Sequence, residues 1–224
     1  MMEQSLREGL AALSLPTDAA VPLMAFSAQL LETNKVMNLT AITEPEDVAR
    51  LHLLDCAALL HMTDFRGKRV VDVGTGAGFP GMPLRILEPD FDLTLLDSLG
   101  KRIAFLQRVT CVHARAEEFA AKHREQYDIA TSRAVAALNV LCELTLPLVK
   151  VGGRFLAMKA VDSDEEIRGA KSAIAQLGGA VEDIRDYTIP GTDITHRVVV
   201  IGKVKPTPDA FPRAFAKIKK APLI

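Results

Sequence analysis

The sequence predicts an α/β fold: a doubly wound, mostly parallel sheet of the Rossmann-like kind with an N-terminal helical extension. Up to residue 61, apolar residues recur at roughly helical spacing. From residue 69 onward, short apolar runs alternate with helical stretches, and the first run, residues 70–73, ends at a cluster of glycines. Such runs are typical of strands buried on both faces of a parallel sheet. Their alternation with helices indicates the doubly wound arrangement.

The N-terminal segment, residues 1–64, is expected to form helices that pack on the core. Thr17 and Asp18 resemble a helix start, and Pro45 suits a first helical position before two acidic residues. The apolar residues that follow these two starts fall on helical faces: Val21, Met24, Leu30, Leu31, Leu51, Leu54, Ala58 and Leu59. The predicted helical region therefore covers residues 3–61.

The core domain is expected to span residues 65–204. The predicted helices are residues 80–87, 138–149 and 162–177, and Gly152-Gly153 is interpreted as a turn. The predicted strands, of which the last two form an antiparallel pair, are residues 70–73, 93–96, 127–130, 155–158, 181–189 and 197–204.

One connection in this core is short. Between Asp97 and Thr110 only twelve residues must hold a crossover helix and its loops, the bare minimum for a parallel connection. Either the crossover is unusually short, or residues near Val109 are missing from the chain.

The bulk composition fits a cytoplasmic globular protein. Hydrophobic residues make up 49% of the chain, and a formal net charge of -1 gives no overall signal for a nucleic-acid partner. The three cysteines lie far apart without a CxxC spacing, which indicates a reducing compartment and no metal site. The N-terminus lacks the apolar core of a signal peptide, and no apolar run approaches the roughly 20 residues that a membrane helix needs. We expect a cytoplasmic monomer with no membrane and no metal partner.

A glycine-rich turn, Gly74-Thr75-Gly76-Ala77-Gly78, follows the first predicted strand. Glycines are required where the backbone takes a positive φ or approaches a ligand closely, and the next helix offers unpaired N–H groups. Dinucleotide-binding folds favour GxGxxG, whereas here the third glycine comes one position early and Asp72 precedes the first. This GxGxG variant is similar to the first motif of class I methyltransferases, whose loop holds the methionine and ribose portions of S-adenosylmethionine.

Asp97 ends the second predicted strand, downstream of this turn. A carboxylate there can accept hydrogen bonds from both ribose hydroxyls of a nucleotide-type ligand. The structural alternative is an aspartate that caps the next helix, although Ser98 would be the better cap. The glycines upstream favour the binding role.

Six segments in order make the sequence resemble a family of bacterial small-subunit rRNA methyltransferases, RsmG or GidB. They are residues 34–40, 50–55, 72–81, 95–102, 115–118 and 132–134. The similarity covers roughly residues 20–204 and extends to residues 211–213 and 221–223. The sequence departs from the family pattern in the short stretch after Arg108 and at Phe215-Ala216, where a glycine-bearing turn is usual.

The resemblance implies transfer of a methyl group from S-adenosylmethionine to N7 of guanine 527 in 16S rRNA, as RNA or within the small-subunit particle. It implies that Ala116 and Glu117 flank the adenine and that Arg133 lies beside the transferred methyl group. The expected cofactor-binding residues are Gly74, Thr75, Gly76, Gly78, Phe79, Asp97, Ser98, Ala116, Glu117 and Arg133.

Arg133 is the predicted catalytic residue, because it follows a strand at the carboxyl edge where ligands bind in open α/β sheets. Guanine N7 has a lone pair and no proton to lose, so Arg133 would position or stabilise without a general base. The structural alternative is a surface arginine paired with Glu117 or Asp128. The chain lacks an Asp/Asn-Pro-Pro-Tyr box, and neither Cys111 nor Cys142 has the Pro-Cys setting of carbon-5 enzymes.

Candidate RNA contacts come from several segments. His52 and Asp55 share a helix face, where a buried histidine with a local partner is the alternative to a place at the RNA or cofactor mouth. Asn38 is either a base contact or a turn residue. The expected RNA-binding residues are Asn38, His52, Lys101, Arg102, Arg115, Lys159, Arg197, Arg213, Lys217 and Lys219.

The tail, residues 205–224, carries the clearest electrostatic signal. From Lys203 onward, six basic residues stand against one acid, Asp209. Four prolines disfavour regular structure here, so a mobile basic arm for phosphate contacts is expected. A solvated tail that aids solubility is the alternative.

Two other functions stay open. One is a nicotinamide-dependent oxidoreductase on the same sheet, disfavoured by the GxGxG spacing and by the lack of an evident proton donor. The other is a non-catalytic RNA-binding or assembly factor that kept the fold.

Overall fold

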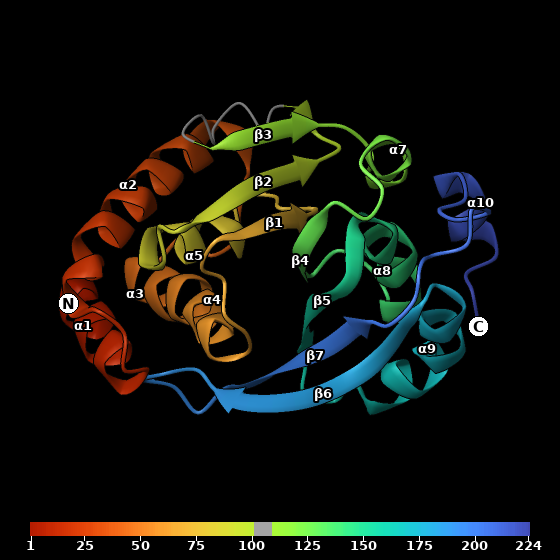
Figure 1. The fold of residues 1–224 in the computed structure, drawn as a ribbon. Helices are drawn as coiled ribbons and strands as arrows, with labels where there is room; N and C mark the ends of the chain where they lie inside the picture. Colours follow the sequence, from red (N-terminus) through yellow and green to blue (C-terminus); the bar gives the residue numbers. More distant parts are fainter. Residues whose placement is uncertain (101–108) are drawn as a thin grey trace.

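The computed structural model describes residues 1–100 and 109–224 (Figure 1). Within these residues the centre is a seven-stranded sheet of order β3-β2-β1-β4-β5-β7-β6. Its strands are β1 (Lys68–Val73), β2 (Phe91–Asp97), β3 (Thr110–His113), β4 (Tyr127–Arg133), β5 (Val149–Ala160), β6 (Gly179–Thr188) and β7 (Thr195–Lys203). Strands β1 to β5 pair in parallel, and β7 runs antiparallel between β5 and β6. The predicted doubly wound sheet and its terminal antiparallel pair are confirmed.

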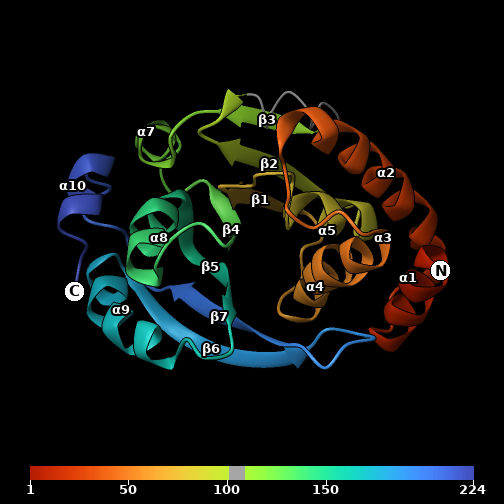
Figure 2. The same ribbon diagram turned by 180° about the vertical axis from the view of Figure 1, so that it is seen from behind.

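Two groups of helices cover the two faces of the sheet (Figures 1 and 2). On one face lie α1 (Met2–Ala12), η1 (Thr17–Ala19), α2 (Ala20–Met37), α3 (Pro45–Asp47), η2 (Val48–Leu54), α4 (Asp55–Ala57), η3 (Ala58–His61) and α5 (Gly81–Leu87). On the other lie α7 (Ala116–Lys122), α8 (Leu138–Thr145), η4 (Leu146–Leu148) and α9 (Asp164–Gln176).

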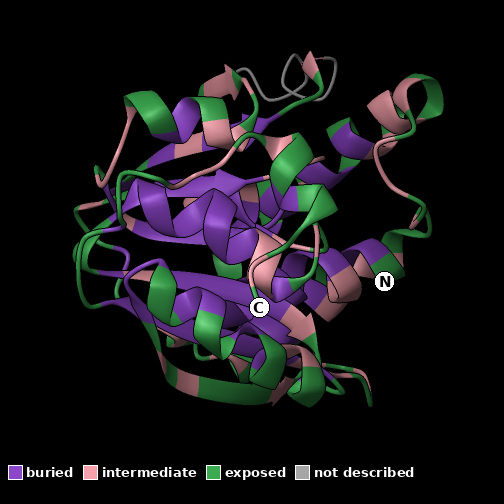
Figure 3. Ribbon diagram, turned by 90° about the vertical axis from the view of Figure 1, so that its right-hand side faces the viewer, coloured by how far each residue is buried: buried purple, intermediate pink, exposed green. Residues whose placement is uncertain are grey.

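The strand residues alternate between these two layers. Val70 packs with the N-terminal helices, while its neighbour Val71 packs with the α7–α9 group, as the period of two along a strand requires. Figure 3 shows that buried residues fill the central strands and the inward sides of the helices, whereas the outer strand β6 is largely exposed. The N-terminal helices therefore share one hydrophobic core with the sheet.

The strand order reverses at β1, because β2 lies on one side of it and β4 on the other. In open α/β sheets, ligands bind outside the carboxyl ends of the strands at such a switch point. The residues that leave β1 and β4 at this point are the glycine-rich turn and Ala134. The topology thus brings the two predicted motifs to one place.

The interpretation of Gly152-Gly153 as a turn before a strand is wrong in its placement. Both glycines lie inside β5, and the helical stretch before it ends at Leu148. The chain is irregular there, because Tyr127 pairs with Val149 while Ile129 pairs with Arg154, and Gly152 has a φ of +85°. A Cβ at Gly153 would lie 2.5 Å from the carbonyl oxygen of Asp128, so the close approach of β4 also requires a glycine.

The expectation of a mobile tail without regular structure is also wrong. Residues 205–224 contain the helix α10 (Phe215–Lys220), and Ile218 within it is fully buried. Lys203 is not part of an arm, since it ends β7 and its side chain is buried. The four prolines disfavour regular hydrogen-bonded structure in the tail. Contacts with the core hold the tail in place instead.

Two further features concern only the described residues. None of their helices has the length and apolar character needed to cross a membrane. They also hold no group of three or more His, Cys, Asp or Glu side chains placed to bind a metal ion. The short crossover after Asp97 falls largely on residues 101–108, outside the described residues.

Candidate active site

The glycine-rich turn leaves β1 at the switch point. Gly74 has a φ of +71°, a conformation that side-chain-bearing residues rarely adopt. A Cβ there would also lie 2.5 Å from Cγ2 of Val135, in the segment that follows β4. Glycine at this position therefore lets two strand ends approach each other.

The side chain of Asp72 holds the glycine-rich turn in its conformation. Its carboxylate is fully buried and accepts hydrogen bonds from the Thr75 hydroxyl at 2.6 Å, the Thr131 hydroxyl at 3.2 Å and the Gly81 N–H at 3.0 Å. Burial raises the pKa of Asp72 to about 6, against the effect of these bonds. The turn is thereby tied to β4 and to α5 through one side chain.

Asp97 lies at the border of a cavity and also makes hydrogen bonds within the protein. Its carboxylate borders a cavity, and it also accepts hydrogen bonds from the Gly76 N–H at 2.9 Å and the Leu99 N–H at 2.8 Å. The Asp97 carboxylate thus holds the glycine-rich turn at the border of the cavity.

The cofactor cavity, as we name it, lies beside this turn and has a volume of about 290 Å³. Five residues expected at the cofactor line it: Gly74, Asp97, Ser98, Ala116 and Glu117. Arg115, expected at the RNA, is in this wall instead. The other lining residues, which sequence reasoning missed, are Val73, Leu96, Ala114, Ala134, Val135, Leu144 and Phe215. Leu144 and Phe215 come from α8 and the tail, so no local pattern could place them here.

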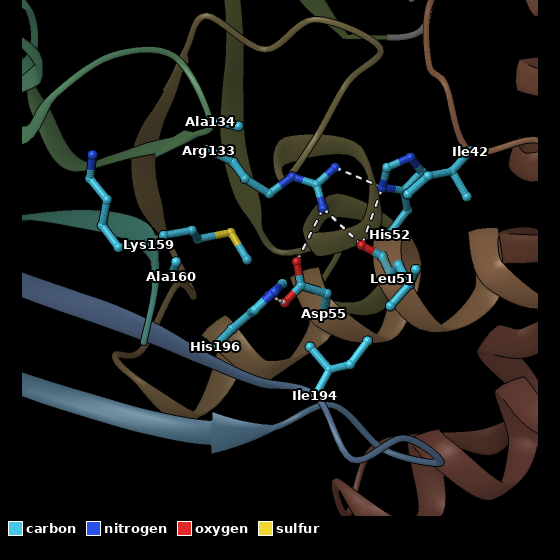
Figure 4. Close-up of a pocket in the computed structure, with 11 residues that line it drawn as sticks. Ile42, Leu51, His52, Asp55, Arg133, Ala134, Lys159, Ala160, Ile194 and His196 are labelled. Carbon is cyan, nitrogen blue, oxygen red and sulfur yellow. Dashed lines mark hydrogen bonds and ion pairs between the residues drawn. The ribbon is translucent and has the colours of Figure 1, made fainter. Parts of the chain in front are cut away.

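A second cavity, which we name the acceptor cavity, has a volume of about 520 Å³ (Figure 4). It is lined by Ile42, Leu51, His52, Asp55, Arg133, Ala134, Met158, Lys159, Ala160, Ile194 and His196. Ala134 lines both cavities, so they adjoin at this residue. Its φ of +55° is costly for an alanine; this turn separates Arg133 in one cavity from Val135 in the other.

Arg133 is held on several sides in the acceptor cavity (Figure 4). Its guanidinium donates from Nη1 to the Leu51 carbonyl and to Asp55 Oδ2, both at 3.1 Å, and from Nη2 to His52 Nδ1 at 3.0 Å. It also lies over the ring of Phe79, 4.8 Å from the centroid. The predicted surface pairing with Glu117 or Asp128 is replaced by this buried arrangement.

His52 is neutral in this arrangement. Nδ1 of His52 lies 3.0 Å from Nη2 of Arg133, which only donates, and 3.2 Å from the Leu51 carbonyl, which only accepts. The shorter contact and the adjacent cation favour an accepting Nδ1, with the proton on Nε2, which lies 2.8 Å from the Thr40 hydroxyl. Burial, together with the nearby charge of Arg133, lowers the pKa of His52 to about 4. Both ring nitrogens of His52 are therefore occupied.

Asp55 is the centre of the remaining contacts. Its side chain is 1% exposed, and besides Arg133 it accepts from the Tyr187 hydroxyl at 2.7 Å and from His196 Nδ1 at 2.8 Å. The bond to Asp55 raises the pKa of His196. Tyr187 and His196 stand on β6 and β7, more than 130 residues along the chain from Asp55, and sequence reasoning missed both.

Phe79 and Arg133 were expected at the cofactor, and the structure places both outside the cofactor cavity wall. The ring of Phe79 is buried and stacks on His52, with centroids 4.5 Å apart. Phe79 thus supports the side chains of the acceptor cavity. Of the turn residues, Thr75 is buried and directed at Asp72, and Gly76 is bonded to Asp97.

Arg197 was expected to contact RNA, but its guanidinium is already paired within the protein. Arg197 is buried and pairs with Asp186 at 2.6 Å and Asp164 at 2.8 Å. Lys159 lies in the acceptor cavity wall, where it donates to Glu166 at 2.7 Å. These cations are neutralised by partners from other parts of the sequence.

The other RNA candidates differ in exposure. Lys217 and Lys219 are exposed on α10. Asn38 is exposed and ends α2 in a left-handed conformation, the turn position considered for it. Arg213 is paired with buried Glu143 at 2.6 Å. Lys101 and Arg102 lie outside the described residues.

Comparison with known proteins bears on this site. The sequence profile described as GidB, rRNA small subunit methyltransferase G, matches residues 21–194. A protein of Clostridium perfringens named ribosomal RNA small subunit methyltransferase G is 45% identical over 212 residues, which cover 89% of each chain. A protein of the same name from Alkaliphilus metalliredigens is 46% identical over 213 residues, 90% of this chain and 89% of the relative.

Solved structures share the fold at low sequence identity. TrmN from Thermus thermophilus is 21% identical with a TM-score of 0.51, over 66% of this chain and 48% of that one. The T. thermophilus 16S rRNA N2 G1207 methyltransferase, solved with AdoMet and guanosine, is 20% identical with a TM-score of 0.50, over 72% of this chain and 40% of that one.

Proposed function

The chain belongs to the rRNA small subunit methyltransferase G family, and from this premise we propose that it methylates N7 of guanine 527 in 16S rRNA. It is an S-adenosylmethionine-dependent rRNA methyltransferase. One observation supports the proposal for the guanine. Ala134 lines both the cofactor cavity and the acceptor cavity, and the acceptor cavity contains the fixed side chain of Arg133.

The residues of the cofactor cavity fit S-adenosylmethionine. Asp97 places a carboxylate in the cavity wall, a group to which ribose hydroxyls can donate, and Gly74 leaves room where a Cβ would meet Val135. Leu144 and Ala116 supply apolar wall for a purine. Polar groups such as Ser98 and Glu117 complete the wall and can fix the orientation of a ligand.

The chemistry needs no proton acceptor. When bound, S-adenosylmethionine supplies an electrophilic methyl group on a sulfonium, and N7 of guanine has an in-plane lone pair and no proton to lose. The residues around Arg133 agree with such chemistry, because His52 has no free nitrogen and is neutral above about pH 4. The chain's contribution is then orientation of the guanine and exclusion of water.

Arg133 is the residue that we assign to the guanine. Its guanidinium is fixed by Leu51, His52 and Asp55, so little side-chain freedom is lost when a base binds against it. A planar guanidinium can stack on a purine or donate to its acceptors. We therefore place Arg133 beside the acceptor base.

The setting of the reaction is also part of the proposal. We place the protein in the cytoplasm as a monomer, acting on 16S rRNA or on the small-subunit particle. Residues 1–64, 65–204 and 205–224 would serve as helical extension, methyltransferase core and basic tail.

The test is a transfer assay with labelled S-adenosylmethionine and two substrates, isolated 16S rRNA and small-subunit particles that lack the modification. We expect the labelled methyl group to be transferred to at least one of these two substrates. Heat-shift measurements with S-adenosylhomocysteine and with NAD separate methyl transfer from the oxidoreductase alternative, because only the first ligand should raise Tm. An Arg133→Ala protein that binds RNA but transfers no methyl group would argue against a purely non-catalytic assembly role.

A further inference from the structure

We propose that Phe215, in the tail helix α10, is a cofactor-binding residue whose ring covers the adenine end of the cofactor cavity. This inference rests on the proposed function, since it takes S-adenosylmethionine as the occupant of that cavity. It makes the tail a working part of the active site.

The position of Phe215 identifies the end of the cavity that it covers. The ring lines the cavity, and the guanidinium of Arg115 lies 5.6 Å from its centroid. Arg115 directly precedes α7, whose first residues, Ala116 and Glu117, line the same cavity. Figures 1 and 2 show α10 near α7 and α8, on the side toward which the arrowheads of β1, β2 and β3 point. Phe215 thus lies in the part of the cavity wall next to Arg115 and the start of α7.

Two contacts with α8 fix the tail on either side of Phe215. Before it, Arg213 donates from Nε and Nη2 to Glu143 at 2.8 and 2.6 Å, and the Glu143 side chain is fully buried. After it, Asn139 Nδ2 donates to the Leu223 carbonyl at 2.7 Å. Because both anchors stand on one helix, α10 is placed against the cavity and not merely near it.

A third anchor holds the tail farther upstream. The guanidinium of Arg124 donates to the carbonyls of Phe211 at 2.7 Å and Pro208 at 3.0 Å, and also to that of Thr207. Thr207 N–H in turn donates to Glu125 at 2.8 Å. The path from β7 to α10 is therefore set by the core before any ligand binds, which lowers the entropy lost on binding.

The chemistry of these side chains suits a purine. An aromatic ring offers a flat apolar surface on which a base can stack, and Leu144 from α8 adds apolar wall beside it. The cation of Arg115 over the ring restrains its orientation.

The test is calorimetric titration of the full chain with S-adenosylhomocysteine and with 5′-methylthioadenosine, which keeps the adenosine part and lacks the amino acid. Phe215→Ala should weaken both ligands by about tenfold or more, as loss of an aromatic stacking partner does. Phe215→Tyr keeps the ring and should bind within about twofold of the parent. Phe211→Ala is the matched control, because this phenylalanine belongs to the same tail and is not in the cavity wall.

Each outcome decides the question. Equal losses for both ligands in Phe215→Ala, with slowed amide exchange of residues 215–220 when the parent protein binds S-adenosylhomocysteine, support the assignment. Unchanged affinity in Phe215→Ala, or a loss confined to S-adenosylhomocysteine, overturns it, and so does an equal loss in Phe211→Ala. If the parent protein itself binds neither ligand, the proposed function is what has failed.

Discussion

At the scale of single residues, a chain of side-chain contacts holds Arg133. Asn34 Oδ1 accepts from the Thr40 N–H at 2.9 Å, the Thr40 hydroxyl accepts from His52, and His52 accepts from Arg133. The asparagine and the threonine lie in the sequence segment that carries part of the family resemblance. Their contribution to the site is indirect, through the orientation of His52.

The pKa of His52 predicts a dependence of stability on pH. The unfolded chain binds a proton at this histidine near its ordinary pKa of 6.5, whereas the folded protein does so only near 4. The stability that neutral His52 contributes is therefore present above pH 6.5 and is lost as the pH falls toward 4. When the pH is lowered from 7.5 to 5, the unfolding free energy should fall in both proteins. The fall should be about 2 kcal/mol smaller in the His52→Gln variant than in the parent protein.

Urea titrations of both proteins at the two pH values check this. Asp72 acts in the opposite sense, because its raised pKa gives stability that is present below 3.8 and is lost as the pH rises through about 6. The contribution of Asp72 cancels when the two proteins are compared. Parallel pH dependence in parent and variant would refute the assignment of a neutral, buried His52.

Arg133→Lys separates binding from transfer. A lysine has one nitrogen and cannot contact Leu51, His52 and Asp55 in the geometry of the guanidinium. We expect transfer to fall by about 100-fold or more, while affinity for S-adenosylhomocysteine changes by less than about threefold, since Arg133 lies outside the cofactor cavity wall. Single-turnover kinetics and calorimetry measure the two quantities. A large loss of cofactor affinity would instead place Arg133 at the cofactor, as the family resemblance implies.

At the scale of elements, the sequence predicts those whose signal is local. The run at residues 70–73, the glycines after it and Asp97 are neighbours along the chain, and their arrangement was predictable. Tyr187, His196 and Phe215 reach the site from β6, β7 and α10, so only the packed fold brings them there. Gly153 was misread for the same reason, because the group that requires it, the Asp128 carbonyl, is on another strand.

The tail anchor gives an asymmetric prediction for stability. Arg213→Ala leaves the fully buried Glu143 carboxylate without its cation and should destabilise the fold by about 3 kcal/mol. Glu143→Gln should cost less than about half of that, because the Arg213 side chain is 23% exposed and can reach water. Chemical denaturation of the two variants makes the comparison, with the double variant as the control for coupling. A greater loss in Glu143→Gln would contradict this account of the anchor.

At the scale of the whole molecule, a net charge of -1 conceals local basic surface. Lys217 and Lys219 are exposed on α10, the helix that also carries Phe215. Arg197, Arg213 and Lys159 were also expected to bind RNA, yet in the structure each forms an ion pair with a carboxylate. Composition could not separate the two groups, because the pairing partners come from other elements.

Lys217 and Lys219, two of the three exposed lysines of α10, should contribute to RNA affinity through counterion release. In Lys217→Ala/Lys219→Ala, the slope of log affinity against log salt should become shallower by roughly one to two, about 0.7–0.9 for each phosphate that is no longer neutralised. Filter binding of a 16S rRNA fragment over a salt series measures it. Lys171→Ala, an exposed lysine on α9, is the control. An equal change in slope for that control would show that α10 has no special place at the RNA.

We propose that two cavities sharing Ala134 in their walls bring a methyl donor and a guanine N7 together without a general base. The most direct measurement is to treat unmodified small-subunit particles with the protein and labelled S-adenosylmethionine, and then map the label by the strand cleavage that N7-methylguanine permits after mild reduction. We expect one labelled guanine in 16S rRNA, at position 527, and no label with Arg133→Ala. Label on another atom or another base, or undiminished transfer by Arg133→Ala, would contradict it.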